Sequence, residues 1–226
     1  MIGIISALAV EAELLIESSE KAPQTVNITG IDFHKIVLSG KTAVVAVCGV
    51  GKVNAARTAE AMIIAFNPRL IINTGVAGGL SDNLSIGDIV ISEKVLQHDF
   101  DTSPLGDPKG YLSTPPLVYI PAEEVTAKLL KASAEKLGFN AVLGTIASGD
   151  QFIWKPEQKE FITSEFGASC AEMEGAAIGH VCYLSGVPFV VIRAISDGAN
   201  NESPVSFPEF CKMAADNSAK LLKSIF

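Results

Sequence analysis

The sequence has few of the residues that hold metals, disulfides or nucleic acids. Its four cysteines, at positions 48, 170, 182 and 211, include no CxxC pair, and its three histidines lack the spacing of metal ligands. This pattern argues against a disulfide framework or a zinc site and favours a reducing compartment. Lys and Arg form no cluster and the formal net charge is −8, which makes nucleic acid and anionic membranes poor partners.

Long hydrophobic runs are also missing. No apolar run reaches the roughly 18 residues that suggest a membrane span, and the N-terminus has no basic stretch of a signal peptide. We therefore expect a soluble cytoplasmic protein without a membrane partner.

The composition that is present favours a compact α/β protein. Of the 226 residues, 48% are hydrophobic and only 19% are charged, which argues against disorder. No internal repeat or linker divides the chain. We expect one domain over residues 1–226, long enough to bury a sizeable core.

Apolar patterns predict strands that alternate with helices. The predicted strands cover residues 2–8, 69–75, 86–100, 141–147 and 188–195, with a hairpin over 31–49 that turns at 39–41. The predicted helices cover residues 9–22, 52–66, 123–137, 155–165, 172–185 and 207–225. This alternation predicts a three-layer α/β/α sandwich around a mixed, mostly parallel twisted sheet.

A long irregular segment interrupts the alternation at residues 101–122. It holds five of the eleven prolines. Long loops in compact domains tend to be lids or contact surfaces, so we expect one of these roles here.

Two glycine-rich turns follow predicted strands, "CGVGKVNAA" at 48–56 and "NTGVAGGL" at 73–80. The first is similar to a dinucleotide fingerprint, but Asn54 stands where the third glycine belongs and no carboxylate follows the next strand. It also fails as a phosphate-binding P-loop, because Val53 replaces Ser or Thr. The glycines can equally serve tight turns alone or allow the backbone to approach a small ligand.

Polar residues stand where a buried strand ends. The stretch "PFVVIRAISD" begins as an apolar strand and finishes with Arg193, Ser196 and Asp197. Glu11 follows the first strand, and Glu174 lies in "AEMEGAAIGHV". Each carboxylate alone can be an ordinary helix-start or surface residue. Together they suit glycosidic hydrolysis, which uses one carboxyl group as acid and another as base.

The chain resembles the 5′-methylthioadenosine/S-adenosylhomocysteine nucleosidases of the nucleoside phosphorylase superfamily. The resemblance runs through "IGIISALAVEAE", "GVGKVNAA", "INTGVAGGL", "GDIVIS", "ASGDQFI", "AEMEGAAIGHVC" and "VPFVVIRAISD", and so covers nearly the whole chain. The order of "SGDQF", "EMEGAA" and "RAISD" is its most specific part. It implies a nucleoside phosphorylase-like fold and an adenine nucleoside as substrate, with no metal or organic cofactor.

The resemblance implies a role for each carboxylate. Glu11 would be the general base that takes a proton from water beneath the ribose, and Asp197 the general acid at purine N7. Glu174 would bind the ribose 2′- and 3′-hydroxyls and stabilise the oxocarbenium-like transition state. Arg193 would fix the water and Glu11, and Ser196 would orient Asp197.

The remaining expected substrate contacts come from several parts of the chain. Met173 would pack on the ribose, Phe152 would stack on the purine, and the backbone of Ile153 would read its edge. Other expected contacts are Leu8, Val50, Val76, Ala77, Gly78 and Phe207. The resemblance also implies a homodimer, in which Leu105 and Pro115 of one subunit border the pocket of the other.

One position departs from the family pattern. Val76 stands where many members have a serine that helps to hold the water. In this position the chain resembles members that accept a bulkier 5′ group, so 6-amino-6-deoxyfutalosine is a possible further substrate. Two alternatives remain at this level. A phosphorolytic enzyme is disfavoured because the early loops lack the arginines that would bind phosphate. A non-catalytic nucleoside-binding protein is disfavoured because it needs no acid near N7.

Overall fold

The computed structural model describes residues 1–197 and 207–226, the latter without the side chains of 207–211 and 214. Its main sheet has ten strands within these residues. They are β1 (Ile2–Ser6), β2 (Gln24–Ile28), β3 (Ile31–Leu38), β4 (Lys41–Val47), β5 (Ile71–Gly79), β6 (Ile89–Gln97), β9 (Ile120–Pro121), β10 (Ala141–Ser148), β11 (Cys170–Glu172) and β12 (Phe189–Asp197).

The main sheet is mixed, as predicted, with parallel strands at its centre. Its order is β11-β10-β6-β12-β5-β1-β4-β3-β2, and β9 pairs with β6. β1 lies parallel to β4 and β5, and β5 lies parallel to β12. β6 runs antiparallel to β12. β11 also pairs with β5, so β5, β12, β6, β10 and β11 close into a ring.

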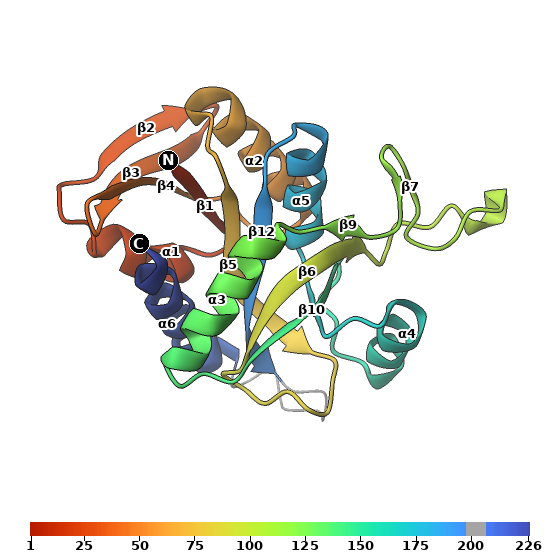
Figure 1. Ribbon diagram of the computed structural model, residues 1–226. Helices are drawn as coiled ribbons and strands as arrows, with labels where there is room; N and C mark the ends of the chain where they lie inside the picture. Colours follow the sequence, from red (N-terminus) through yellow and green to blue (C-terminus); the bar gives the residue numbers. More distant parts are fainter. Residues whose placement is uncertain (198–206) are drawn as a thin grey trace.

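Helices cover both faces of this sheet (Figure 1). They are α1 (Ala9–Glu17), α2 (Lys52–Phe66), α3 (Glu124–Lys136), α4 (Pro156–Phe166), α5 (Gly175–Leu184) and α6 (Phe207–Ile225). Small and apolar residues of α2 and α5 pack in one core cluster, and those of α1, α3 and α6 in a second. These two cores are the two interfaces of the predicted three-layer sandwich.

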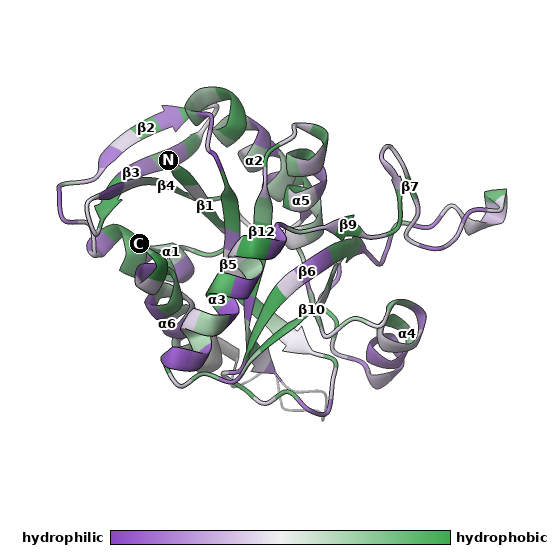
Figure 2. Ribbon diagram, in the orientation of Figure 1, coloured by the Kyte–Doolittle hydropathy of each residue, from purple (hydrophilic) through white to green (hydrophobic). Residues whose placement is uncertain are grey.

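Hydrophobic residues are concentrated on the central strands, whereas β2 and much of α4 are polar (Figure 2). Every residue of β1 is buried, and most of β2 is exposed. None of the helices in the described part of the chain is both long and apolar enough to cross a bilayer.

The predicted element bounds need several corrections. Residues 73–80, expected to be a glycine-rich turn after a strand, belong largely to that strand, because β5 continues to Gly79. The first helix ends at Glu17 rather than at 22, with Ser18 as its C-cap. The hydroxyl of Ser19 donates to the carbonyl of Lys21 and accepts the N–H of Val37 in β3, so this segment bonds outside the helix. The edge strand β2 was missed because its exposed, polar sequence has no apolar signal. The predicted helix 172–185 begins only at Gly175, because β11 takes Cys170–Glu172 and pairs with β10.

Segment 101–122 contains short ordered pieces rather than no structure. They are a 3-10 turn (Ser103–Leu105), the small hairpin of β7 (Leu112–Ser113) and β8 (Pro116–Leu117), and β9. Figure 1 shows the turn and the hairpin projecting away from the sheet. Leu105, the last residue of the 3-10 turn, is 83% exposed, whereas Pro115 is buried.

Candidate active site

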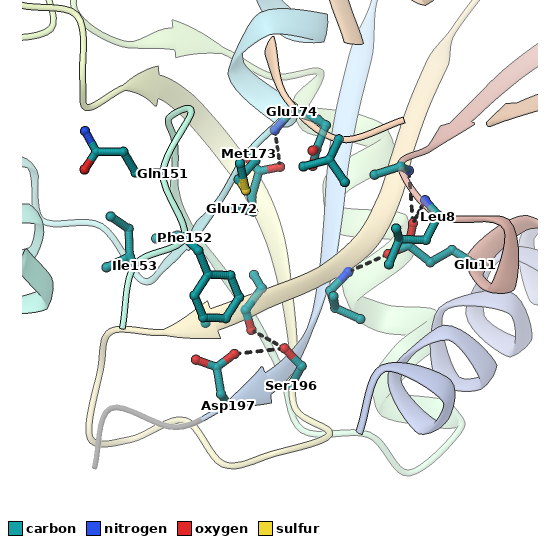
Figure 3. Close-up of a pocket in the computed structure, with 16 residues that line it drawn as sticks. Leu8, Glu11, Gln151, Phe152, Ile153, Glu172, Met173, Glu174, Ser196 and Asp197 are labelled. Atoms are coloured by element: carbon teal, nitrogen blue, oxygen red, sulfur yellow. Dashed lines mark hydrogen bonds between the residues drawn. The ribbon is translucent and has the colours of Figure 1, made fainter. Parts of the chain in front are cut away.

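A pocket opens where the central parallel strands reach their carboxyl ends, as expected for ligand sites of α/β sheets. Its volume is about 580 Å³ including the mouth, within the range for small-molecule sites. Figure 3 shows its lining. The lining residues are Ala7, Leu8, Glu11, Val50, Val76, Ala77, Gly78, Gln151, Phe152, Ile153, Ala171, Glu172, Met173, Glu174, Ser196 and Asp197.

The structure brings together the three selected carboxylates and most of the expected contacts. Arg193 is absent from the lining, and the side chain of Phe207 lies outside the described residues. Leu105 and Pro115 also do not line the pocket of their own chain. Sequence reasoning missed Ala7, Gln151, Ala171 and Glu172, although Gln151 and Glu172 lie inside the motifs "SGDQF" and "EMEGAA".

Glu11 bridges the gap where β1 and β5 separate. Its Oε2 accepts the backbone N–H groups of Ala7 (3.0 Å) and Leu8 (2.9 Å), and its Oε1 accepts that of Val76 (3.3 Å). Burial raises the pKa of Glu11 above its ordinary value, although these N–H groups and the charge of Arg193 oppose the rise. The carboxyl group is therefore firmly oriented and poised to bind a proton.

The position of the Glu11 carboxylate depends on a glycine in β5, Gly75. A Cβ built on Gly75 would lie 2.8 Å from Glu11 Oε1 and 3.3 Å from Arg193 Nη1. Both groups thus occupy the space that any other residue at position 75 would fill. The glycine of "NTGVAGG" admits the charged groups to the strand end.

Glu174 lies at the start of α5, on another wall of the pocket. Its Oε1 accepts the backbone N–H of Gly51 at 2.8 Å. Burial and the neighbouring charge of Glu172 raise the pKa of Glu174 to about 7, against the opposing effects of Arg193 and Gly51. A carboxyl group with this pKa changes its charge near neutral pH.

Arg193 is bound chiefly by Glu172, a residue that the sequence interpretation did not select. Its Nε donates to Glu172 Oε2 at 3.1 Å, and its Nη2 donates to Glu172 and, at 2.5 Å, to Asn73 Oδ1. No hydrogen bond from Arg193 to Glu11 occurs among the described residues, and Arg193 acts on Glu11 through its charge, which lowers the pKa of Glu11. The expected role of Arg193 in fixing the water and Glu11 stays a prediction. The guanidinium is buried, and a buried charge is stable only when paired.

Glu172 also determines where α5 begins. It accepts the N–H groups of Glu174 (3.0 Å) and Gly175 (2.8 Å), while Ser148 Oγ accepts that of Ala176 (2.7 Å). Burial alone would raise the pKa of Glu172, but Arg193, Ser148 and Gly175 hold it below its ordinary value. Glu172 is therefore an anion that fixes both the guanidinium and the helix start beside Glu174.

Asp197 ends β12 on the remaining wall. Ser196 Oγ donates to Asp197 Oδ1 at 2.9 Å, as the dashed lines in Figure 3 show. A Cβ on Gly78 would come within 3.0 Å of Asp197 Oδ2, so this glycine also makes room for a carboxyl group. Phe152, 47% exposed, extends its ring toward the same region (Figure 3).

Cys48, Cys170 and Cys182 are free thiols, and burial raises the pKa of each. No cluster of three or more potential metal ligands occurs among the described residues.

Comparison with known proteins places this geometry in a family. The model of the phosphorylase superfamily matches residues 1–226. 5′-Methylthioadenosine/S-adenosylhomocysteine nucleosidases of Shewanella halifaxensis and Geobacillus kaustophilus are both 43% identical, over 98% and 99% of this chain and 96% and 95% of theirs.

Solved structures agree with these sequence matches. A variant of the Helicobacter pylori nucleosidase with 5′-methylthioadenosine in its active site has a TM-score of 0.94 at 38% identity, covering 99% of this chain and 96% of that one. A Helicobacter pylori structure described as futalosine hydrolase has the same values. The Neisseria meningitidis nucleosidase with methylthio-immucillin-A has a TM-score of 0.94 at 36% identity, covering 99% and 97%. The chain therefore belongs to the 5′-methylthioadenosine/S-adenosylhomocysteine nucleosidase family of the phosphorylase superfamily.

Proposed function

We propose that this protein hydrolyses the N-glycosidic bond of 5′-methylthioadenosine and S-adenosylhomocysteine, and of 5′-deoxyadenosine, to adenine and the free ribose derivative. The observation that carries the proposal is the convergence of Glu11, Glu174 and Asp197 on one pocket with a largely apolar middle. Cleavage of a glycosidic bond needs a base for water, an acid for the leaving group and stabilisation of a positively charged ribose. Three separately held carboxyl groups meet these needs.

Glu11 activates the water. Its three backbone donors leave one lone-pair direction of the carboxylate for a water molecule, and its raised pKa improves it as a proton acceptor. The water attacks the anomeric carbon as the bond to adenine breaks, and its proton passes to Glu11. Arg193 supports this step through its charge, since its hydrogen bonds are directed to Glu172 and Asn73.

Asp197 protonates the leaving group. Transfer of a proton from Asp197 to purine N7 lets adenine depart as a neutral molecule rather than as an anion. The hydroxyl of Ser196 fixes the rotamer of this carboxyl group. Phe152 stacks on the purine, and the backbone of Ile153 pairs with its edge.

Glu174 holds the ribose. As an anion it accepts hydrogen bonds from the 2′- and 3′-hydroxyls, and its charge stabilises the oxocarbenium character of the transition state. Met173 packs against the sugar. Leu8, Val50, Val76, Ala77 and Gly78 complete the apolar walls.

The 5′ substituent lies at the mouth of the pocket, and the proposed assembly is a homodimer. The projection of segment 101–122 and the 83% exposure of Leu105 support a contact of this segment with a second subunit. Leu105 and Pro115 of one subunit would border the 5′ pocket of the other, opposite Phe207. Sedimentation at assay concentration tests this proposal, and a fully active monomer contradicts it.

A second substrate is 6-amino-6-deoxyfutalosine. Two observations favour it: Val76 lines the pocket without a hydroxyl group, and one structural neighbour is described as futalosine hydrolase. The same base, acid and diol-binding groups serve this reaction because the bond that breaks is the same kind of N-glycosidic bond. Competition between this compound and methylthioadenosine for one site tests the assignment.

The cellular setting that suits this activity is methionine salvage and recycling of S-adenosylmethionine by-products in the cytoplasm, by a single nucleosidase domain over residues 1–226. The match of the superfamily model to the whole chain supports the single domain. The proposed steps use only water and side chains of this protein.

Chromatography of methylthioadenosine incubated with the protein in phosphate-free buffer tests the reaction. We expect adenine and methylthioribose, and no release by Glu11→Gln. Release of adenine only after phosphate or arsenate is added would indicate a phosphorylase. Binding in calorimetry without adenine release would indicate a non-catalytic binding protein.

A further inference from the structure

Three chain segments meet beside the pocket in a polar cluster that the proposed mechanism does not use. Each segment contributes one residue to the cluster. Lys52 is the first residue of α2, Asp99 follows β6, and Asp150 follows β10. Lys52 Nζ lies 2.7 Å from Asp99 Oδ1. None of the three residues lines the pocket.

Asp150 is held at two points, by the side chain of Asp99 and by the backbone of Lys52. The N–H of Asp150 donates to Asp99 Oδ2 (2.8 Å), and Asp150 Oδ1 accepts the backbone N–H of Lys52 (2.8 Å). Lys52, Asp99 and Asp150 thus close a ring of three bonds. Lys52 Nζ also donates to Gln97 Oε1 at 3.1 Å. The side chains of Lys52 and Asp99 are only 18% and 16% exposed, so removal of one charge leaves the other largely buried without its ion-pair partner.

Two residues of this ring, Lys52 and Asp150, are adjacent in the chain to residues that form or support the pocket wall. Gly51, the residue before Lys52, donates its N–H to Glu174 at 2.8 Å, on the ribose side. Asp150 is followed at once by Gln151, Phe152 and Ile153, which line the base side. A Cβ on Gly51 would lie 3.1 Å from Asp150 Oδ1, so the two segments are packed closely.

We propose that Lys52 and Asp99 are positioning residues that fix the separation between the ribose-binding carboxylate Glu174 and the base-binding segment 151–153. A nucleoside must contact both walls at once, and its reacting bond lies between them. A small change in their separation misplaces the anomeric carbon relative to water and acid, which is costly for catalysis. A ligand that touches only one wall does not sense this separation.

The inference rests on the proposed nucleosidase function. Its test uses full-length Lys52→Met, Asp99→Asn and the double variant, with Lys131→Met as the matched control. Lys131 forms an ion pair with Glu135 on α3, away from the pocket lining. The measurements are kcat and KM for methylthioadenosine, and calorimetric Kd values for adenine and for a carbon-linked adenosine analogue whose base cannot leave.

We expect each single variant to lower kcat/KM by about 10–100-fold. The double variant should be no worse than the poorer single variant, because the two residues act as one unit. The analogue, which spans both walls, should lose affinity, while the Kd of adenine changes less than about threefold. Lys131→Met should match the wild type, and Lys52→Arg, which keeps the charge, should retain most activity.

Equal losses of affinity for adenine and for the analogue would overturn the proposal, because they would indicate general damage to the pocket. Losses that multiply in the double variant, or unchanged kinetics in both single variants, would also overturn it. Thermal melting identifies variants that fail to fold. If a single variant fails to fold, the same kinetic and affinity measurements on Lys52→Arg and on the double variant, which has no unpaired charge, test the proposal. Failure of the proposed function is distinct, since the wild type itself would then release no adenine.

Discussion

Glu172 and Glu174 are two residues apart, yet only Glu172 is paired closely with Arg193. Arg193 Nε lies 3.1 Å from Glu172 Oε2, whereas Arg193 Nη2 lies 3.8 Å from Glu174 Oε2. The pKa of Glu172 is lowered and that of Glu174 is raised to about 7. One charge of this pair is therefore permanent near neutral pH, and the other is titratable.

The first prediction concerns the pH dependence of catalysis. Because Glu174 must be an anion to stabilise the ribose cation, kcat/KM should fall as the pH decreases below about 7. Glu11 must also be deprotonated, and its raised pKa acts on the same acid limb. The profile of kcat/KM between pH 5 and 9 checks this. In Glu174→Gln the acid limb should be that of Glu11 alone, and an unchanged profile would contradict the assignment.

The second prediction is that Glu174→Gln weakens catalysis more than binding. The amide still hydrogen-bonds the ribose diol but carries no charge to offset the cation, so kcat should fall by about 10²–10³ with a small change in KM. Steady-state kinetics with methylthioadenosine measures both constants. A rise in KM with an unchanged kcat would contradict the electrostatic role of Glu174.

The third prediction is that the same Glu174→Gln substitution stabilises the fold above neutral pH. The folded-state pKa is raised, so the folded protein binds the proton more tightly than the unfolded chain, and wild-type stability decreases as the pH rises from about 4.5 to about 7. The glutamine variant avoids this loss. Its free energy of unfolding should exceed that of the wild type by on the order of 1 kcal/mol at pH 8.

Urea unfolding of both proteins at pH 5 and pH 8 measures this difference. The advantage of Glu174→Gln should shrink toward pH 5, where the wild-type carboxyl group is already neutral. A variant that is less stable than the wild type at pH 8 would show that hydrogen bonds of the anion outweigh its burial.

The fourth prediction is that Gly75→Ala disables Glu11. The new methyl group would lie 2.8 Å from Glu11 Oε1, so the carboxylate must move and kcat should fall by about 10–100-fold. The control is the same substitution in a Glu11→Gln background, where little further loss is expected. Equal losses in both backgrounds would mean that Gly75→Ala acts on the fold rather than on the base.

The fifth prediction tests Asp197 as the acid. Asp197→Asn preserves the shape of the side chain but has no proton to transfer, so turnover of adenine nucleosides should fall by about 10²–10⁴. A 7-methylated purine nucleoside has a leaving group that is already cationic and needs no proton at N7. Its hydrolysis should be much less sensitive. An equal loss on both substrates would assign Asp197 a role in binding or structure.

Local patterns in the sequence were sufficient for the elements whose neighbours in the chain determine them. The helix over 52–66 has the predicted bounds, because its apolar spacing is followed directly by Asn67 and Pro68. The hairpin of β3 and β4 turns between Leu38 and Lys41, as its Ser-Gly signal predicted. β2 was missed because its exposed, polar sequence has no apolar signal, although it pairs with its neighbour β3. β11 was missed because it is a strand of only three residues that pairs with the distant strand β10.

The sequence by itself determined the residue types of the site, through the motifs around Glu11, Glu174 and Asp197, and the resemblance that assigned their roles. Only the tertiary structure decided which of their neighbours act together. Glu172 and Arg193 are 21 residues apart, and Asn73 is 120 residues from Arg193. Their contact exists because β5 pairs with both β11 and β12. Such long-range pairing depends on the whole folded sheet and leaves no periodic trace in the chain.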